Sequence, residues 1–142
     1  MTDIRKFAVE ETGLIHLRDG DDELMCADDA QGQPDKSRPM QIVVYGPGSK
    51  TFAKAQAAQN NKVMERLKRK GKTEQTAAER AAETAEFLAA CTKSFENIEY
   101  DKLEGEALFK AVYADTSIGF IADQVNKHLG DWGNFTTRAN KS

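Results

Sequence analysis

The sequence has little of what catalytic, metal-binding or membrane-spanning proteins need. It holds two histidines, one tryptophan and two cysteines, Cys26 and Cys91, which lie far apart and form no CxxC pair. Isolated cysteines of this kind indicate free thiols in a reducing compartment. No apolar run approaches the ~20 residues of a membrane helix, and the start of the chain lacks the apolar core of a signal peptide. We therefore expect a cytosolic protein without membrane association.

The residue types that could carry chemistry do not stand in a recognisable pattern. The acidic turn at residues 19–23 lacks the spaced ligands and terminal glutamate of an EF-hand loop, so a solvated turn is favoured. His16 and His128 have no cysteine or second histidine nearby in sequence, which favours structural or exposed roles. Residues 46–50 join a strand to a helix but lack the GxxxxGK spacing of a phosphate loop. We predict no catalytic residue, no metal site and no cofactor, and hence no enzyme.

The net charge of −3 conceals a strong segregation of charge along the chain. Residues 1–36 carry ten acids and four bases, residues 49–72 carry eight bases and one acid, and residues 73–106 carry nine acids and three bases. The predicted basic face of the middle stretch consists of Lys62, Arg66, Lys68, Arg69 and Lys70. Such a face could meet phosphates, but the chain has no nucleic-acid motif and its acidic flanks oppose that approach. We favour a solvated face or an acidic protein partner.

The first third of the chain predicts a small antiparallel sheet. Short apolar runs at residues 7–9 and 14–17 flank Thr12-Gly13, which is typical of a hairpin turn. Asp19-Gly20 predicts a second turn, followed by a weaker strand at residues 24–26. Residues 28–39 are polar, with glycine and two prolines, and are expected to form a mobile loop. The β-branched run MQIVVY at residues 40–45 predicts the best strand.

The rest of the chain is predicted to be mostly helical. Ser49 is a good N-cap for a long helix over residues 50–70, with Gly71 as its stop. Thr76 begins a capping box for a second helix, which is expected to reach about residue 95. Opposite charges on their facing edges predict that these two helices form a hairpin. A third helix is expected at residues 107–113, and a fourth runs from Asp115 to Gly130. The apolar stripe of the fourth helix is formed by Ile118, Ile121, Val125 and Leu129.

These patterns predict an α+β fold in a single domain over residues 1–142. A small N-terminal antiparallel β-sheet, a β-meander, occupies residues 1–48. A mostly α-helical body of about four helices occupies residues 49–135, and residues 136–142 form a frayed tail. Trp132 and Phe135 lie beyond the last helix. Their rings either fold back onto the core or anchor another chain, since large rings are favoured at binding hot spots.

The order of these elements resembles the tail assembly chaperones of lambda-like siphophages. The likeness covers roughly residues 7–135 and rests on four stretches in order: MQIVVYGPGSKTFAKAQ, NKVMERLKRKGK, AAERAAETAEFLAAC and ALFKAVYADTSIGFIADQVNKHLGDWGNF. The last is similar to the family's step of tyrosine, a small residue and aspartate into a helix with a late Gly-Asn-Phe. Residues 28–39 and the last two residues match the family least.

The resemblance implies an assembly factor that acts in the host cytoplasm and is absent from the virion. Such chaperones keep the long, helical tape measure protein soluble while tail tube subunits polymerise around it. In many relatives a ribosomal frameshift makes a longer form whose extra part recruits the tail tube protein, and this chain would be the shorter product. The family has no catalytic residues to transfer. Self-association of the chain stays open.

A chaperone of this kind needs exposed, weakly apolar surface along its helices. The predicted contacts with the partner are Met64, Leu67, Phe120, Trp132 and Phe135. Many copies on one long partner would let weak contacts suffice. Two alternatives remain: a structural minor tail or head-tail joining protein, and a nucleic-acid-binding regulator that uses the basic helix at residues 50–72. Mass spectrometry of purified virions separates the first from a chaperone, and DNA binding at low salt tests the second.

Overall fold

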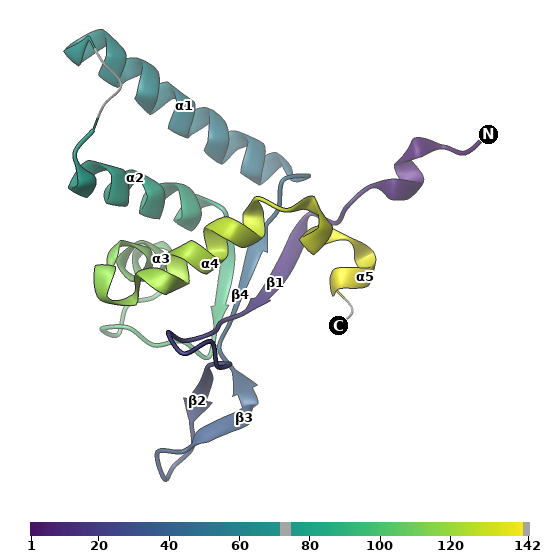
Figure 1. The fold of residues 1–142 in the computed structure, drawn as a ribbon, viewed down its shortest axis with the longest axis vertical. Coiled ribbons are helices and arrows are strands. Elements are labelled where there is room, and N and C mark those ends of the chain that lie inside the picture. Colours follow the sequence, from purple (N-terminus) through teal and green to yellow (C-terminus); the bar gives the residue numbers. More distant parts are fainter. Residues whose placement is uncertain (72–74, 141–142) are drawn as a thin grey trace.

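The computed structural model of the chain describes residues 1–71 and 75–140, without the side chain of Lys70, and has an α+β fold (Figure 1). The elements are η1 (Ile4–Phe7), β1 (Thr12–His16), β2 (Cys26–Asp28), β3 (Pro34–Pro39), β4 (Gln41–Tyr45), α1 (Lys50–Lys70), α2 (Ala77–Ala90), β5 (Thr92–Glu96), α3 (Gly105–Ala114), η2 (Thr116–Ile118), α4 (Gly119–Leu129), η3 (Trp132–Phe135) and α5 (Thr137–Asn140). An antiparallel sheet of order β1-β4-β5 supports a mostly helical body. The predicted fold class is confirmed.

The ends of the two long helices follow the sequence signals. The Ser49 side chain accepts a hydrogen bond from the backbone N–H of Phe52 at 3.1 Å, which satisfies one donor at the start of α1. At the other end Gly71 has a left-handed backbone with φ 71°, and its N–H donates to the carbonyl of Leu67 at 2.8 Å. Thr76 accepts from the N–H of Glu79 at 3.1 Å. The predicted N-caps of α1 and α2 are confirmed.

The second helix is shorter than predicted, because the chain turns into a strand at Thr92. We expected this helix to reach about residue 95, but α2 ends at Ala90 and residues 92–96 form β5. The N–H of Tyr45 donates to the carbonyl of Cys91 at 2.6 Å, and Phe95 pairs with Ile42. Pairing with β4 therefore overrides a helical period that continues to Phe95. The sheet takes its third strand from the part of the chain that we expected to be mostly helical.

Three N-terminal predictions are wrong. Thr12-Gly13 is no hairpin turn, because both residues lie inside β1, where Gly13 pairs with Val44. Residues 7–9 form no strand, since Phe7 is the last residue of the 3-10 turn η1 and residues 8 and 9 have no regular structure. The expected loop at residues 28–39 contains β3, which pairs with β2 in a separate hairpin. Prolines stand at both ends of β3, where the strand needs no backbone donor from them. The turn at Asp19-Gly20 is confirmed, since the N–H of Asp19 donates to the carbonyl of Glu23 at 2.8 Å.

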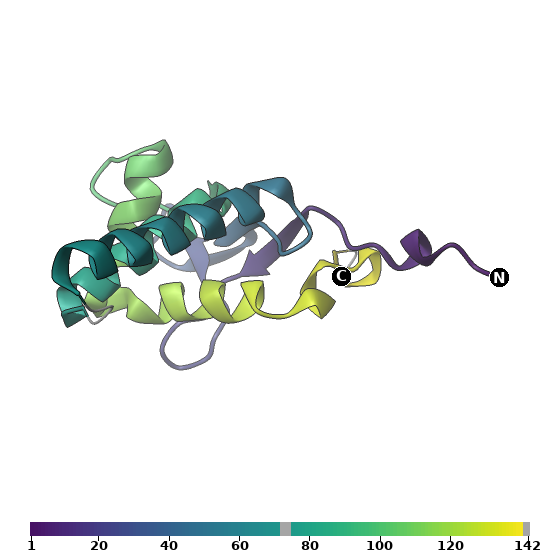
Figure 2. The same cartoon turned by 90° about the horizontal axis from the view of Figure 1, so that it is seen from above.

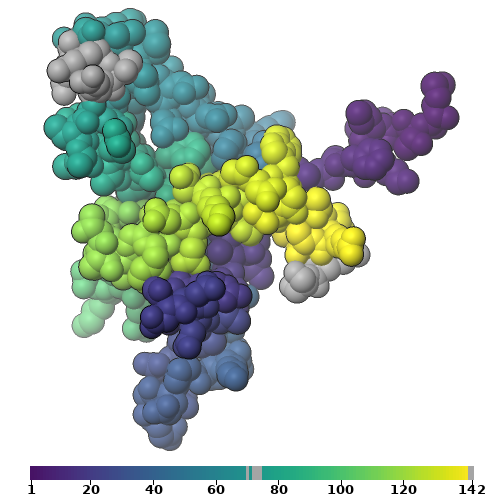
Figure 3. All heavy atoms as spheres, in the orientation of Figure 1, coloured from purple at the N-terminus to yellow at the C-terminus, as the bar shows by residue number. Residues whose placement is uncertain are grey.

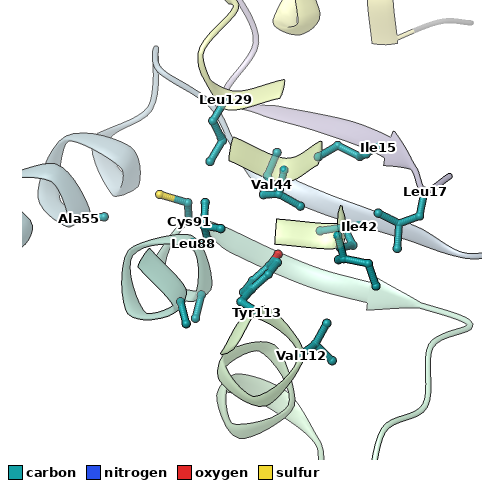
Figure 4. Packing of buried hydrophobic residues seen from close by; sticks show 14 of the residues in the cluster. Ile15, Leu17, Ile42, Val44, Ala55, Leu88, Cys91, Val112, Tyr113 and Leu129 are labelled. Carbon is teal, nitrogen blue, oxygen red and sulfur yellow. The ribbon is translucent and has the colours of Figure 1, made fainter. Parts of the chain in front are cut away.

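The core lies between one face of the sheet and helices α2, α3 and α4 (Figure 4). Its fully buried side chains are Leu17, Ile42, Val44, Leu88, Cys91, Val125 and Phe135. Three of the four predicted stripe residues of α4 are buried: Ile121, Val125 and Leu129. The hydroxyls of Thr92 and Tyr113 meet at 2.7 Å, which satisfies two polar groups inside this core. Burial raises the pKa of the Tyr113 hydroxyl.

The helices are not equally embedded. Helix α1 packs beside α2 at the outer edge of the body, and its long outer surface is open (Figures 1 and 3). Residues 1–8 extend away from the body, as two perpendicular views show (Figures 1 and 2). At the other terminus residues 137–140 form a short helix instead of the predicted frayed tail, and Asn140 Nδ2 donates to the carbonyl of Thr12 at 2.9 Å. Residues 141 and 142 of that predicted tail lie outside the described residues.

Candidate partner-binding surfaces

Ion pairs between α1 and α2 divide the predicted basic face. Lys62 pairs with Glu86, and Arg66 pairs with Glu83, so both cations face α2. Arg66 is buried. The hydrogen bond from Lys62 lowers the pKa of the Glu86 carboxyl. The predicted helical hairpin with opposite charges on its facing edges is confirmed.

The basic face is therefore not one continuous surface. Lys68 and Arg69 are exposed, and the side chain of Lys70 lies outside the described residues, as does Lys72. A nucleic acid that approached α1 would meet fewer cations than the sequence suggests, because two of the five predicted ones are held by carboxylates of α2.

A second surface of α1 carries an exposed stripe that is apolar except for one asparagine. The members of this α1 stripe are Ala53, Ala57, Asn60, Met64 and Leu67. They step by four, three, four and three residues, the spacing that places side chains along one seam of a helix. All five are exposed; Met64 keeps 53% and Leu67 41% of their accessible surface. The side of α1 that packs inward is different, and includes Ala55 and Arg66.

Phe135 and Trp132 have opposite environments. Phe135 is fully buried, with its ring against Gly13 and Gly46 and 5.4 Å from the His128 ring in an edge arrangement. The prediction of a partner contact at Phe135 is wrong for this structure, because the ring closes one end of the core. Trp132 keeps 57% of its surface exposed and lies near Gly48, at the start of α1. Of the two rings, Trp132 alone remains a candidate anchor.

The predicted contact residues do not gather on one surface. Phe120 is half-buried and lines a shallow hollow with Arg18 and Gln124, whose side-chain oxygen accepts from the N–H of Arg18 at 2.8 Å. Met64 and Leu67 lie on the second half of α1, whereas Trp132 lies beside the residue before its N-cap. A rise of 1.5 Å per residue separates these two places by roughly 24–29 Å. Met64 and Leu67 form one site, and Phe120 and Trp132 belong to two others.

Sequence reasoning missed a hollow beside the edge of the sheet. It lies between β5, the loop at residues 97–104 and the start of α3, with a volume of about 920 Å³. We name it the β5 hollow. Its apolar wall includes Phe95, Ile98, Leu103 and Phe109. The loop that shapes it holds Asn97, Asp101 and Lys102 at positive φ, a conformation that non-glycine residues adopt infrequently. Asn and Asp tolerate a positive φ better than most residues, so Asn97 and Asp101 were the only local indication in the sequence of a tight loop here.

Chemistry-bearing groups are dispersed. Among residues 1–71 and 75–140, no group of three or more histidine, cysteine and acidic side chains is placed to hold a metal ion. Burial raises the pKa of the Cys91 thiol to about 12, so this sulfur is protonated at neutral pH. No helix within the described ranges is long and apolar enough to cross a membrane.

No protein-family model, no curated protein and no solved structure matches the chain.

Proposed function

We propose that this chain is a tail assembly chaperone of a long-tailed phage, which binds helical segments of the tape measure protein through the α1 stripe. The observation that carries the proposal is a helix of 21 residues that packs on one side only and exposes Met64 and Leu67 in a regular seam. Met64 and Leu67 are neighbours three residues apart on this seam, and contiguous exposed apolar side chains mark many interaction surfaces. The sequence resemblance supplies the partner, because tape measure proteins are long and helical.

The chemistry of the stripe fits a helix. Ala53 and Ala57 have small side chains, so a partner helix can approach closely at the start of α1. Met64 is flexible and adapts to different neighbours, which suits a partner that offers many similar segments. Asn60 lies in the middle of the seam, where a polar residue favours one register over others at a cost in stability. The seam of 15 residues is about 21 Å long, so each contact is weak and many copies must act together.

This role places the chain in the host cytoplasm and outside the finished virion. The tail tube protein would join through a longer, frameshifted form of the chain. A structural virion protein remains the first alternative, and it would be found in purified particles by mass spectrometry. A nucleic-acid-binding regulator is less favoured, because Lys62 and Arg66 pair with carboxylates of α2.

Co-expression with the tape measure protein from the same phage tests the proposal. The wild-type chain should raise the soluble fraction of that protein, and a Met64→Asp, Leu67→Asp double variant should lose most of the effect. Both side chains are exposed, so the variant should keep the thermal midpoint of the wild type. Leu24→Asp is the matched control, since Leu24 is exposed on a distant turn. A wild-type chain that leaves the partner insoluble, or a double variant that rescues it fully, would reject the proposal.

A further inference from the structure

The N-terminal arm, residues 1–8, presents an apolar surface that the rest of the described chain does not cover. The exposed fractions are 81% for Ile4 and 72% for Phe7. Both lie in the 3-10 turn η1, where side chains three residues apart are in line, so they form one apolar face. The turn is stabilised locally: Asp3 accepts from the N–H of Arg5 at 2.9 Å, and the N–H of Ala8 donates to the carbonyl of Arg5 at 3.1 Å.

The arm does not reach the β5 hollow of its own chain. Two perpendicular views show the arm leaving the body on the side away from the loop at residues 97–104 (Figures 1 and 2). The space-filling view shows the arm projecting clear of the packed body (Figure 3). The arm offers an apolar face, and the body of the same molecule offers an apolar hollow. Two copies can therefore form a contact in which the arm of one fills the hollow of the other.

The β5 hollow has the right chemistry for the arm. Its wall offers the apolar side chains Ile98, Leu103 and Phe109. Its surroundings are acidic, because residues 93–106 hold five acids and two lysines. Glu99, Asp101 and Glu104 line the hollow itself beside Lys93 and Lys102, so three acids against two bases leave this lining with one net negative charge.

The arm brings cations to this acidic rim. Arg5 forms an ion pair with Asp3 inside the arm at 2.7 Å, whereas Lys6 lies beside Phe7 with its Nζ 5.9 Å from the ring centre. Lys6 is therefore the cation that accompanies the apolar face. Charge complementarity of this kind favours one partner and orientation over others.

We propose that the arm of one copy binds the β5 hollow of a second copy of this chain. Ile4 and Phe7 enter against Ile98 and Leu103, and Lys6 faces Glu99 on the rim. The contact is heterologous, since it joins two different surfaces, and it either closes between a few copies or extends along a row. The self-association does not depend on the tape measure protein, because both surfaces belong to this chain alone.

The first experiment measures the molar mass of the full chain by light scattering and sedimentation over about 5 to 500 µM, the range expected for a small contact with few anchors. The wild type should exceed the monomer mass as concentration rises. Phe7→Asp should remain a monomer, and the control Leu24→Asp should associate like the wild type. A wild type that stays monomeric over the whole range overturns the proposal. So does a Phe7→Asp variant that associates as the wild type does.

A charge exchange tests the hollow itself. Lys6→Glu and Glu99→Lys should each weaken self-association by roughly 3- to 10-fold, since each places like charges together. The double variant restores an opposite pair between copies and should return to within about twofold of the wild type. Both positions are exposed, so circular dichroism should show unchanged folding in all three. If the two losses instead add in the double variant, Lys6 does not face Glu99, and the proposed contact is rejected.

Discussion

The ring of Phe135 lies directly against the backbone of Gly13, so closely that a Cβ added to this glycine would stand 2.7 Å from Cε1 of the ring. Gly46, on the neighbouring end of β4, faces the same ring. The N–H of Glu10 also donates to the carbonyl of Phe135 at 2.8 Å. The Phe135 ring therefore packs against both β1 and the turn before α1, and it closes the core at this end.

Replacing either glycine should destabilise the fold. Gly46→Ala places a methyl group in the space of the Phe135 ring, and overpacking of this kind costs about 1–3 kcal/mol. Gly20→Ala is the matched control, because no atom lies within 4 Å of the added Cβ and the residue is not at positive φ. Chemical denaturation should show the loss in Gly46→Ala alone. Equal stability of the two variants would show that the ring moves aside freely.

The two rings of the aromatic tail should respond differently to truncation. Phe135→Ala removes a fully buried ring and should cost about 3–5 kcal/mol. Trp132→Ala removes a ring that is more than half exposed, so the loss should stay below about 1 kcal/mol. Thermal melts of both variants check this difference. If Trp132→Ala melts as early as Phe135→Ala, Trp132 is part of the core rather than an available anchor.

The two ion pairs between α1 and α2 should differ in strength. Glu83→Ala leaves the buried Arg66 guanidinium without this carboxylate and should cost about 2–3 kcal/mol, below the ~3–5 kcal/mol of a fully buried pair because Glu83 keeps contact with water. Glu86→Ala breaks the more exposed pair with Lys62 and should cost about 0–1 kcal/mol. Urea titrations measure both. A larger loss for Glu86→Ala than for Glu83→Ala would show that the Lys62–Glu86 pair is the stronger of the two.

The sequence predicts local structure well where a residue satisfies a hydrogen-bonding group of the backbone close to it in sequence. Ser49, Thr76 and Gly71 mark helix ends through contacts within four residues, and all three predictions are confirmed. The sequence does not predict local structure where pairing between distant segments decides between helix and strand. Nothing local distinguishes a helix that continues to Phe95 from a strand that begins at Thr92, because the choice depends on Ile42, some fifty residues away.

The candidate surfaces show the same limit. Charge segregation predicts the α1–α2 hairpin, but not that Lys62 and Arg66 would be occupied within it. The aromatic residues near the C-terminus suggest either core or contact, and only packing against Gly13 and Gly46 assigns Phe135 to the core. The β5 hollow has almost no local signature, since its wall combines side chains from a strand, a loop and a helix.

His128 should make the stability of the fold depend on pH between about 7.5 and 5. Burial lowers the pKa of this imidazole, against a smaller raising effect of Asp131, and its Nε2 has no hydrogen-bond partner among the described residues. The unfolded chain binds the proton more readily than the fold, so the free energy of unfolding is highest above the unfolded pKa of about 6.5 and falls as the pH drops through it. The carboxyls of Asp3, Asp35, Glu86 and Asp115 have lowered pKa values and lose their contribution mainly below about pH 5, at the acid end of this window.

Two histidine variants separate His128 from other titrating groups. Denaturation of the wild type at pH 7.5, 6.5 and 5.5 should show the decline, and His128→Phe should flatten it, because phenylalanine keeps an aromatic ring against Phe135 and cannot bind the proton. His16→Gln is the control variant, because it replaces the other histidine of the chain, which contacts the carbonyl of Met25. A slope that survives in His128→Phe would show that the burial of the imidazole is not the cause of the pH dependence.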